Sequence, residues 1–210
     1  MIFIVTAENR ALFSAELAEV DRQWHAVLAE RSPRKAHSES GVAIEHDDAV
    51  FLVAKAAPAP EVLASVRLVP TDETHSVWEA SGFCVAPEVR VRRARMGLLW
   101  ELVCGVMETA LLFGVERVKF AASAALLPLM LEFGWAPERS CGTLAESDEA
   151  TTPVAVSVTP DGLKNVRRHF GVRGPATRFC DSGMLRMRPQ EYASFPANGE
   201  PHSVRHSHPG

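Results

Sequence analysis

Along most of the chain, segments whose apolar residues are spaced as in β-strands alternate with segments whose apolar residues are spaced as in α-helices. Continuous apolar runs typical of buried strands stand at 1–5, 49–54, 115–121 and 154–158. Helical spacing is clearest over 9–31, where apolar residues recur at steps of four and three: Phe13, Leu17, Val20, Trp24 and Val27. Further helices are predicted over 95–113, 123–134 and 159–170, the first of them ended by Gly114. This alternation predicts an α/β sandwich around a mixed, mainly antiparallel sheet.

Two β-rich runs, 65–71 and 78–85, flank a short polar turn and predict a β-hairpin. Each run holds one charged residue that a buried strand does not keep without a partner, Arg67 in the first and Glu79 in the second. One interpretation is a structural ion pair between neighbouring strands. The other is a carboxylate held in a cleft as a base. Strict alternation along the second run places Phe83 on the face of Glu79 and Trp78 on the opposite face.

Length, composition and charge limit the classes of protein to which this chain can belong. The chain has 210 residues, 47% of them hydrophobic, which suits one globular domain, predicted here over 1–178. Residues 179–210 are rich in Ser, Pro, Gly, Asn and His and predict a flexible tail whose histidines form no metal site. A net charge of −4 gives no electrostatic case for nucleic acid. Four widely spaced cysteines and the lack of a long apolar run predict a cytoplasmic protein without a membrane span.

The hairpin also carries a family resemblance. Its segments "RLVPT" at 67–71 and "WEASGF-V" at 78–85 resemble the "RLLPT … WE-SRF-V" signature of bacterial acyl-homoserine-lactone synthases, the autoinducer synthases of quorum sensing. The resemblance is good over 49–85, weaker up to Trp135, and returns around 153–175. It implies a GNAT-like three-layer fold and an acyltransferase. The implied substrates are S-adenosylmethionine and an acyl group on an acyl carrier protein or on CoA, with no cofactor.

The resemblance also implies roles for individual residues. Glu79 is the candidate base for the amine, and a weak base suffices because an α-amine has a pKa of about 7.7–8.0. The candidate substrate-binding residues are Arg22, Glu45, Asp48, Arg67, Ser81 and Phe83. The family has two acidic residues three positions apart where Glu45 and Asp48 stand, and these would attract the sulfonium and ammonium groups. Arg67 or Arg22 would hold the substrate carboxylate.

Four arginines precede the second long helix: Arg90, Arg92, Arg93 and Arg95. One interpretation is a solvated basic helix start, in which cations oppose the helix dipole. The other is a surface on which an acidic carrier protein docks.

The chain departs from the family pattern on the side of the amine substrate. Gly82 stands where the motif has arginine, and Ala26 stands where the family has phenylalanine four residues after its helix arginine. The six residues between Thr71 and Trp78 replace a much longer segment. Two alternatives therefore stay open: a GNAT-like acyltransferase that uses another amine, and a non-catalytic member with a binding or regulatory role.

Overall fold

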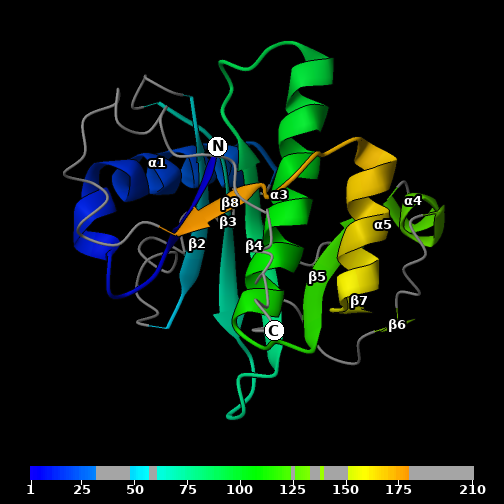
Figure 1. The fold of residues 1–210 in the computed structure, drawn as a ribbon. Coiled ribbons are helices and arrows are strands. Elements are labelled where there is room, and N and C mark those ends of the chain that lie inside the picture. Colours follow the sequence, from blue (N-terminus) through cyan, green and yellow to red (C-terminus); the bar gives the residue numbers. More distant parts are fainter. Residues whose placement is uncertain (32–47, 57–60, 124–125, 133–137, 140–150, 180–210) are drawn as a thin grey trace, which may run out of the picture.

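The computed structural model describes residues 1–31, 48–56, 61–123, 126–132, 138–139 and 151–179, which form one eight-stranded sheet with helices on both faces (Figure 1). The strands are β1 (Ile2–Val5), β2 (Val50–Lys55), β3 (Val62–Pro70), β4 (Val77–Val85), β5 (Arg117–Ser123), β6 (Glu138–Arg139), β7 (Thr151–Ser157) and β8 (Thr177–Phe179). The helices are the short 3-10 helix η1 (Arg10–Phe13), α1 (Ser14–Arg31), α3 (Arg92–Leu112), α4 (Leu126–Glu132) and α5 (Pro160–Phe170). The expected flexible tail lies, from residue 180 on, outside the described residues.

The strand order across the sheet is β6-β7-β5-β4-β3-β2-β1-β8. Strand β4 pairs parallel with β5 and β1 pairs parallel with β8, while the other neighbours are antiparallel. The first and last strands therefore lie side by side (Figure 1). The predicted mixed, mainly antiparallel sheet is confirmed.

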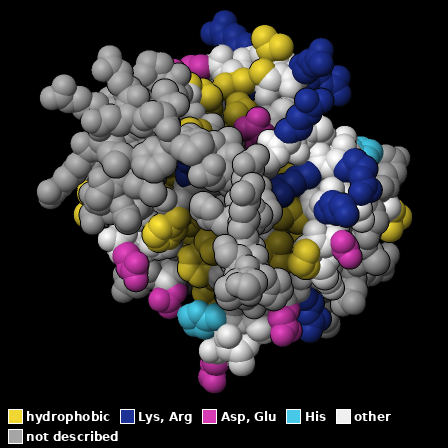
Figure 2. Space-filling view, viewed as in Figure 1, with side chains coloured by type: hydrophobic (Ala, Val, Ile, Leu, Met, Phe, Trp, Pro, Cys, Tyr) yellow, Lys and Arg dark blue, Asp and Glu magenta, His cyan; other side chains and the backbone are white. Residues whose placement is uncertain are grey.

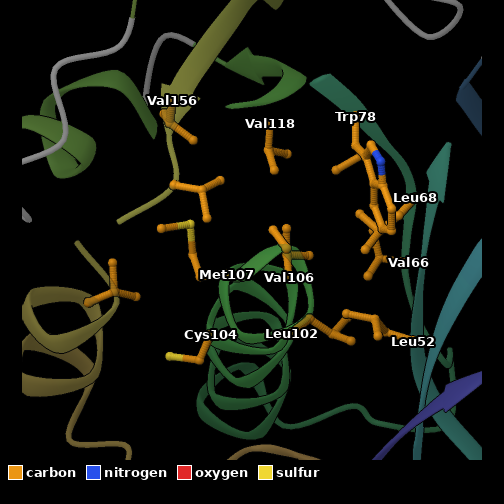
Figure 3. Close-up of a cluster of buried hydrophobic side chains, with 14 of the residues drawn as sticks. Leu52, Val66, Leu68, Trp78, Leu102, Cys104, Val106, Met107, Val118 and Val156 are labelled. Atoms are coloured by element: carbon orange, nitrogen blue, oxygen red, sulfur yellow. The ribbon is translucent and has the colours of Figure 1, made fainter. Parts of the chain in front are cut away.

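Two apolar cores fill the space between the layers. On one face, called the α1 face, the helix residues Leu17 and Val20 pack with sheet residues such as Phe51 and Val53. On the other, called the α3 face, α3 and α5 cover the larger core, part of which is drawn in Figure 3: Leu52, Val66, Leu68, Trp78, Leu102, Cys104, Val106, Met107, Val118 and Val156. The three-layer sandwich follows from these two cores.

The predicted helices and the hairpin are present, with small shifts at their ends. Helix α3 begins at Arg92 rather than near 95, and Gly114 follows its end with a left-handed φ of 71°. Thr159 caps α5, its hydroxyl accepting the N–H of Gly162 at 3.0 Å. The short edge strands β6 and β8 were not predicted.

Strand β4 contains a bulge at Gly82. Ser65 pairs with Cys84 and Arg67 with Ser81, so two residues of β4, Gly82 and Phe83, lie opposite the single residue between them on β3. Gly82 has φ of 64°, a left-handed conformation that favours glycine. The extra residue shifts the alternation by one position, and Phe83 packs against the α3-face core with Trp78. The expectation that Phe83 shares the face of Glu79 is therefore wrong.

The carboxylate of Glu108, on α3, joins three segments that are distant in sequence. Its oxygens accept hydrogen bonds from Arg167 Nη2 (2.7 Å), the N–H of Ala176 (2.9 and 3.0 Å), and both the N–H (2.9 Å) and the hydroxyl (2.7 Å) of Thr177. At Gly105 a Cβ would lie 3.0 Å from Thr177 Cγ2, so α3 and β8 approach closely. Burial, followed by the nearby Glu108 charge, raises the pKa of Cys104 to about 12.

Asp72 organises the turn between β3 and β4. Its carboxylate accepts hydrogen bonds from the Thr74 hydroxyl, from the N–H of Val77 at 2.9 Å and from the Ser76 hydroxyl at 2.9 Å. These donors, Thr74 first, lower the pKa of Asp72 to about 2. The turn is therefore held by the charged form of this carboxyl group.

The bulge predicts an asymmetric response to two glycine substitutions. Gly82→Ala places a Cβ at a left-handed φ and should lower the free energy of unfolding by about 1–2 kcal/mol. The matched control is Gly97→Ala within α3, where a Cβ would meet nothing within 4 Å. That change should raise stability by about 0.5–1 kcal/mol. Denaturant unfolding of both variants is the measurement, and equal effects would contradict the assigned bulge.

The Asp72 turn predicts a pH dependence of stability. A carboxyl group whose pKa is lowered on folding stabilises the fold above its unfolded pKa of about 3.9, and this contribution is lost as the pH falls through about 2. The melting temperature of Asp72→Ala should therefore lie below that of the wild type at neutral pH, with a gap that narrows between about pH 4 and pH 2. Glu73→Ala, which removes the same charge from the exposed neighbouring residue, should show no such narrowing.

Candidate functional site

The two charged residues of the hairpin lie on the α1 face of the sheet. Arg67 pairs across the strands with Ser81, and Val69 pairs with Glu79, in one uninterrupted register. Directly opposed residues of antiparallel strands point to the same face, and Glu79 and Ser81 are two positions apart. Arg67, Ser81 and Glu79 therefore point to one side of the sheet.

Arg67 contacts side chains of both α1 and β4. Its Nε and Nη2 donate to the Ser81 hydroxyl at 3.2 and 3.1 Å, and its guanidinium carbon lies 5.6 Å from the centre of the Trp24 ring. Trp24 comes from α1 and Ser81 is buried in β4, so the arginine bridges the helix and the sheet. The cation–π contact and the hydrogen bonds fix the orientation of the guanidinium plane.

Glu79 stands where β4 and β5 part. Their parallel register runs Val77 with Arg117, Trp78 with Val118 and Glu79 with Lys119. Strand β5 then continues to Ser123 beside β7, and β4 continues to Val85 beside β3. Partners in parallel strands share a face, so Lys119 is the cationic neighbour of Glu79. Both are half-buried.

Lys119 was not among the sequence-predicted site residues. It follows Glu79 by forty positions along the chain, in a strand predicted only as an apolar run. The signal that identifies it is the parallel pairing of β4 with β5, and sequence periodicity does not set that register.

Arg22 points away from this group. Its side chain is 62% exposed and forms a bidentate contact with Glu19, with Nε–Oε2 and Nη2–Oε1 distances of 2.8 and 2.5 Å. The hydrogen bonds from Arg22 lower the pKa of Glu19. Arg22 lines a cavity of about 350 Å³ beside α1 whose wall includes Glu61 and Glu88. The structure thus separates Arg22 from Arg67.

The predicted acidic pair is described only in part. Asp48 is exposed, in the turn before β2, and Glu45 lies outside the described residues. The pairing of Val50 with Leu68 and of Val69 with Glu79 puts Asp48 at the same end of the sheet as Glu79. Its substrate-binding role stays a prediction.

The four arginines around the start of α3 divide into two groups. Arg95 Nη1 donates to the carbonyls of Ala86 and Val89 at 3.2 and 3.3 Å and so closes the connection between β4 and α3. Arg90, Arg92 and Arg93 are exposed. Of the four, these three are fully exposed, and the docking role of the four arginines stays a prediction.

Two searches of the described residues are negative. None of the helices in these ranges is long and apolar enough to cross a membrane. Within the same ranges, no group of three or more His, Cys, Asp and Glu side chains lies close enough to hold a metal ion.

Comparisons with known proteins identify the fold. No family model matches the chain, and no curated protein matches it. The solved structure of a CoA-dependent acyl-homoserine lactone synthase, BjaI, with SAM and isopentyl-CoA, matches with TM-score 0.68 and 21% identity over 92% of this chain and 98% of that one. A second CoA-dependent synthase, MesI, matches with TM-score 0.61 and 20% identity over 84% of this chain and 98% of that one. An acyl-CoA N-acyltransferase from Pseudomonas aeruginosa matches with TM-score 0.55 and 15% identity over 76% and 99%. The chain has the GNAT-like fold of these acyltransferases, as the sequence motifs predict.

Proposed function

We propose that this protein is an acyltransferase that makes N-acyl-homoserine lactones from S-adenosylmethionine and an acyl thioester of CoA or of an acyl carrier protein. The observation that carries the proposal is the position of Glu79, where β4 and β5 part, on the same face as the oriented Arg67. The GNAT-like fold shared with two CoA-dependent synthases supports it.

In the proposed reaction, Glu79 takes a proton from the substrate ammonium, directly or through one water. The free amine then attacks the thioester carbonyl, so that a C–N bond forms, the C–S bond breaks and the thiolate leaves with a proton. An α-amine with a pKa of about 7.7–8.0 costs only on the order of 1 kcal/mol to deprotonate at neutral pH. A carboxylate is therefore a sufficient base. Attack of the substrate carboxylate on the carbon next to the sulfonium then closes the lactone and expels methylthioadenosine.

Arg67 is the proposed partner of the substrate carboxylate. The Ser81 hydroxyl and the Trp24 ring already hold its guanidinium, so less orientational freedom is lost when a carboxylate binds. Lys119, the register partner of Glu79 on β5, is the positively charged residue beside the proposed base. The acidic pair Glu45 and Asp48 is proposed to attract the sulfonium and ammonium groups.

A second candidate function is acyl transfer to a different amine. It is favoured by Gly82, which stands in place of the motif arginine and adopts a left-handed φ, so an arginine there would be strained. It is also favoured by Arg22, which binds Glu19 rather than facing Arg67. A binding or regulatory role without catalysis is the third alternative. Mass spectrometry of products from S-adenosylmethionine and from a panel of other amines distinguishes the three.

The exposed arginines Arg90, Arg92 and Arg93 are proposed to receive the donor. Both an acyl carrier protein and the phosphates of CoA are anionic, and three exposed cations beside the start of α3 attract either one.

Glu79→Gln tests the base. The amide keeps the shape of the side chain but accepts no proton, and loss of a general base typically lowers the rate about 10²–10⁴-fold. Single-turnover acyl transfer with S-adenosylmethionine and acyl-CoA is the measurement. The exposed carboxylate control Glu73→Gln should transfer at the wild-type rate.

The melting temperature of Glu79→Gln is measured alongside the rate. A folded variant with undiminished transfer would show that Glu79 is not the base. A large loss of stability with an unchanged rate per folded molecule would return Glu79 to a structural role in the hairpin.

Charge reversal tests donor docking. The double change Arg92→Glu and Arg93→Glu should raise KM for the acyl donor by about tenfold with little change in kcat, because it alters encounter rather than chemistry. The difference should shrink as salt is raised, since exposed charges are screened beyond about 10 Å at 0.1 M. Lys164→Glu, an exposed reversal on α5, is the control. A KM that stays the same at low salt would contradict docking here.

A further inference from the structure

Glu79 and Lys119 are the last residues that β4 and β5 pair in register, and the two strands part immediately after them. Partners in parallel strands share a face, so the two side chains lie on either side of the point where the split begins. The proposed function makes Glu79 the base. It leaves open which group supplies the proton that the leaving thiolate takes.

Lys119 lies between a carboxylate and a small apolar side chain. Its register partner on β4 is Glu79, and its partner on β7 is Ala155, which is buried. The preceding residue, Val118, packs in the α3-face core, so Lys119 points to the α1 face. An ammonium on a flexible four-carbon stem can therefore reach from Glu79 to a group held where the strands part.

Neither charge of this pair is used in a structural contact. Within the described ranges, the Glu79 carboxylate and the Lys119 ammonium form no hydrogen bond and no ion pair, although both side chains are half-buried. The carboxylate of Glu108 shows the contrast, because it accepts hydrogen bonds from Arg167 and Thr177. Charges that are partly removed from water without a partner cost stability, and a role in binding or reaction explains why they are kept.

Lys119 is separate from the arginines that are proposed to receive the donor. Figure 2 shows Lys and Arg side chains gathered around the start of α3 and the end of α5, and Arg92 and Arg93 are exposed there. These helices cover the α3 face, whereas Lys119 points to the α1 face. Its charge is therefore placed beside the reacting atoms rather than on the surface that a donor approaches.

From this geometry, and resting on the proposed function, we propose that Lys119 is the acid that protonates the leaving sulfur. When the C–S bond breaks, its electron pair stays on sulfur, and the Lys119 ammonium gives the sulfur a proton. The neutral Lys119 amine then takes the proton that the acylated nitrogen loses as the amide forms. Glu79 releases to water the proton that it took from the substrate. One ammonium and one thioester thus give one amide, one thiol and one proton.

Protonation of the sulfur prevents the acyl transfer from reversing. The thiolate is the nucleophilic form of a thiol. A thiolate held beside the still protonated acyl nitrogen can therefore attack the carbonyl again, whereas the thiol does not. Proton transfer by a positioned side chain typically contributes about 10²–10⁴-fold to a rate.

Two substitutions separate proton donation from positive charge. Lys119→Arg keeps the charge but gives up no proton, because a guanidinium is not deprotonated in proteins. Lys119→Met keeps an apolar stem and removes the charge. Single-turnover transfer from acyl-CoA, an alkyl thioester, should fall about 10²-fold or more in both variants. The controls Lys164→Arg and Lys164→Met, at an exposed position of α5, should transfer at the wild-type rate.

An aryl thioester of the same acyl group makes the test specific to the proton. Its thiolate is a weak base that leaves without being protonated, so both Lys119 variants should transfer from it at close to the wild-type rate. A role in holding the strands or in orienting Glu79 would instead lower the rates with the two donors equally. Melting temperatures of both variants show that the compared proteins are folded.

Full activity of Lys119→Arg with acyl-CoA would overturn the assignment, because charge alone would then suffice. An equal loss with the alkyl and the aryl donor would overturn it as well. Either result in an active wild type leaves the proposed function intact. A wild type that acylates neither S-adenosylmethionine nor any other amine would instead overturn the proposed function, and the role of Lys119 with it.

Discussion

The left-handed turn at Gly82 decides which side chains of β4 face the candidate site. Without the bulge, Glu79, Ser81 and Phe83 would all point toward α1, and a bulky ring would fill the space beside Arg67. With it, Phe83 joins Trp78 in the α3-face core, and the α1 face keeps a small hydroxyl and a carboxylate. The bulge follows the last residue of β4 that pairs with β5. The conformation of Gly82 therefore sets which face the remaining residues of this central strand point to.

Much of this architecture could be predicted from the sequence. The apolar runs and the helical stripe indicate which residues are buried, and this pattern can be read from neighbouring positions in the sequence. The short polar turn between the two runs of the hairpin predicts that these runs pair. The predicted hairpin pairing of β3 with β4 is what brings Arg67 and Glu79 to one face. The error at Phe83 came from assuming unbroken alternation through a strand that contains glycine. Gly82 inside a β run was itself a signal for a bulge, because glycine weakens a strand and permits left-handed backbone.

The features that could not be predicted depend on contacts between segments distant in the chain. Lys119 is placed beside Glu79 by the parallel register of β4 and β5, which no short-range sequence pattern specifies. Glu108 reads as an ordinary polar position on a helix, yet it accepts hydrogen bonds from β8 and α5. The desolvation of this buried carboxylate is offset only because donors from both segments converge on it. Strand β8 is too short to be recognised on its own, and where it pairs with β1 it is also hydrogen-bonded to Glu108 of α3.

The net charge of −4 conceals two surfaces of opposite sign. The cavity beside α1 is lined by four carboxylates, and only Arg22 among its lining residues opposes them: Glu16, Glu19, Glu61 and Glu88. The exposed arginines at the start of α3 and after α5 form the other surface. Each field extends only about 8–10 Å at physiological ionic strength, so each surface acts on what approaches it locally rather than through the net charge. Cationic and anionic partners would therefore be attracted to different parts of the surface, the first to the cavity beside α1 and the second to the exposed arginines.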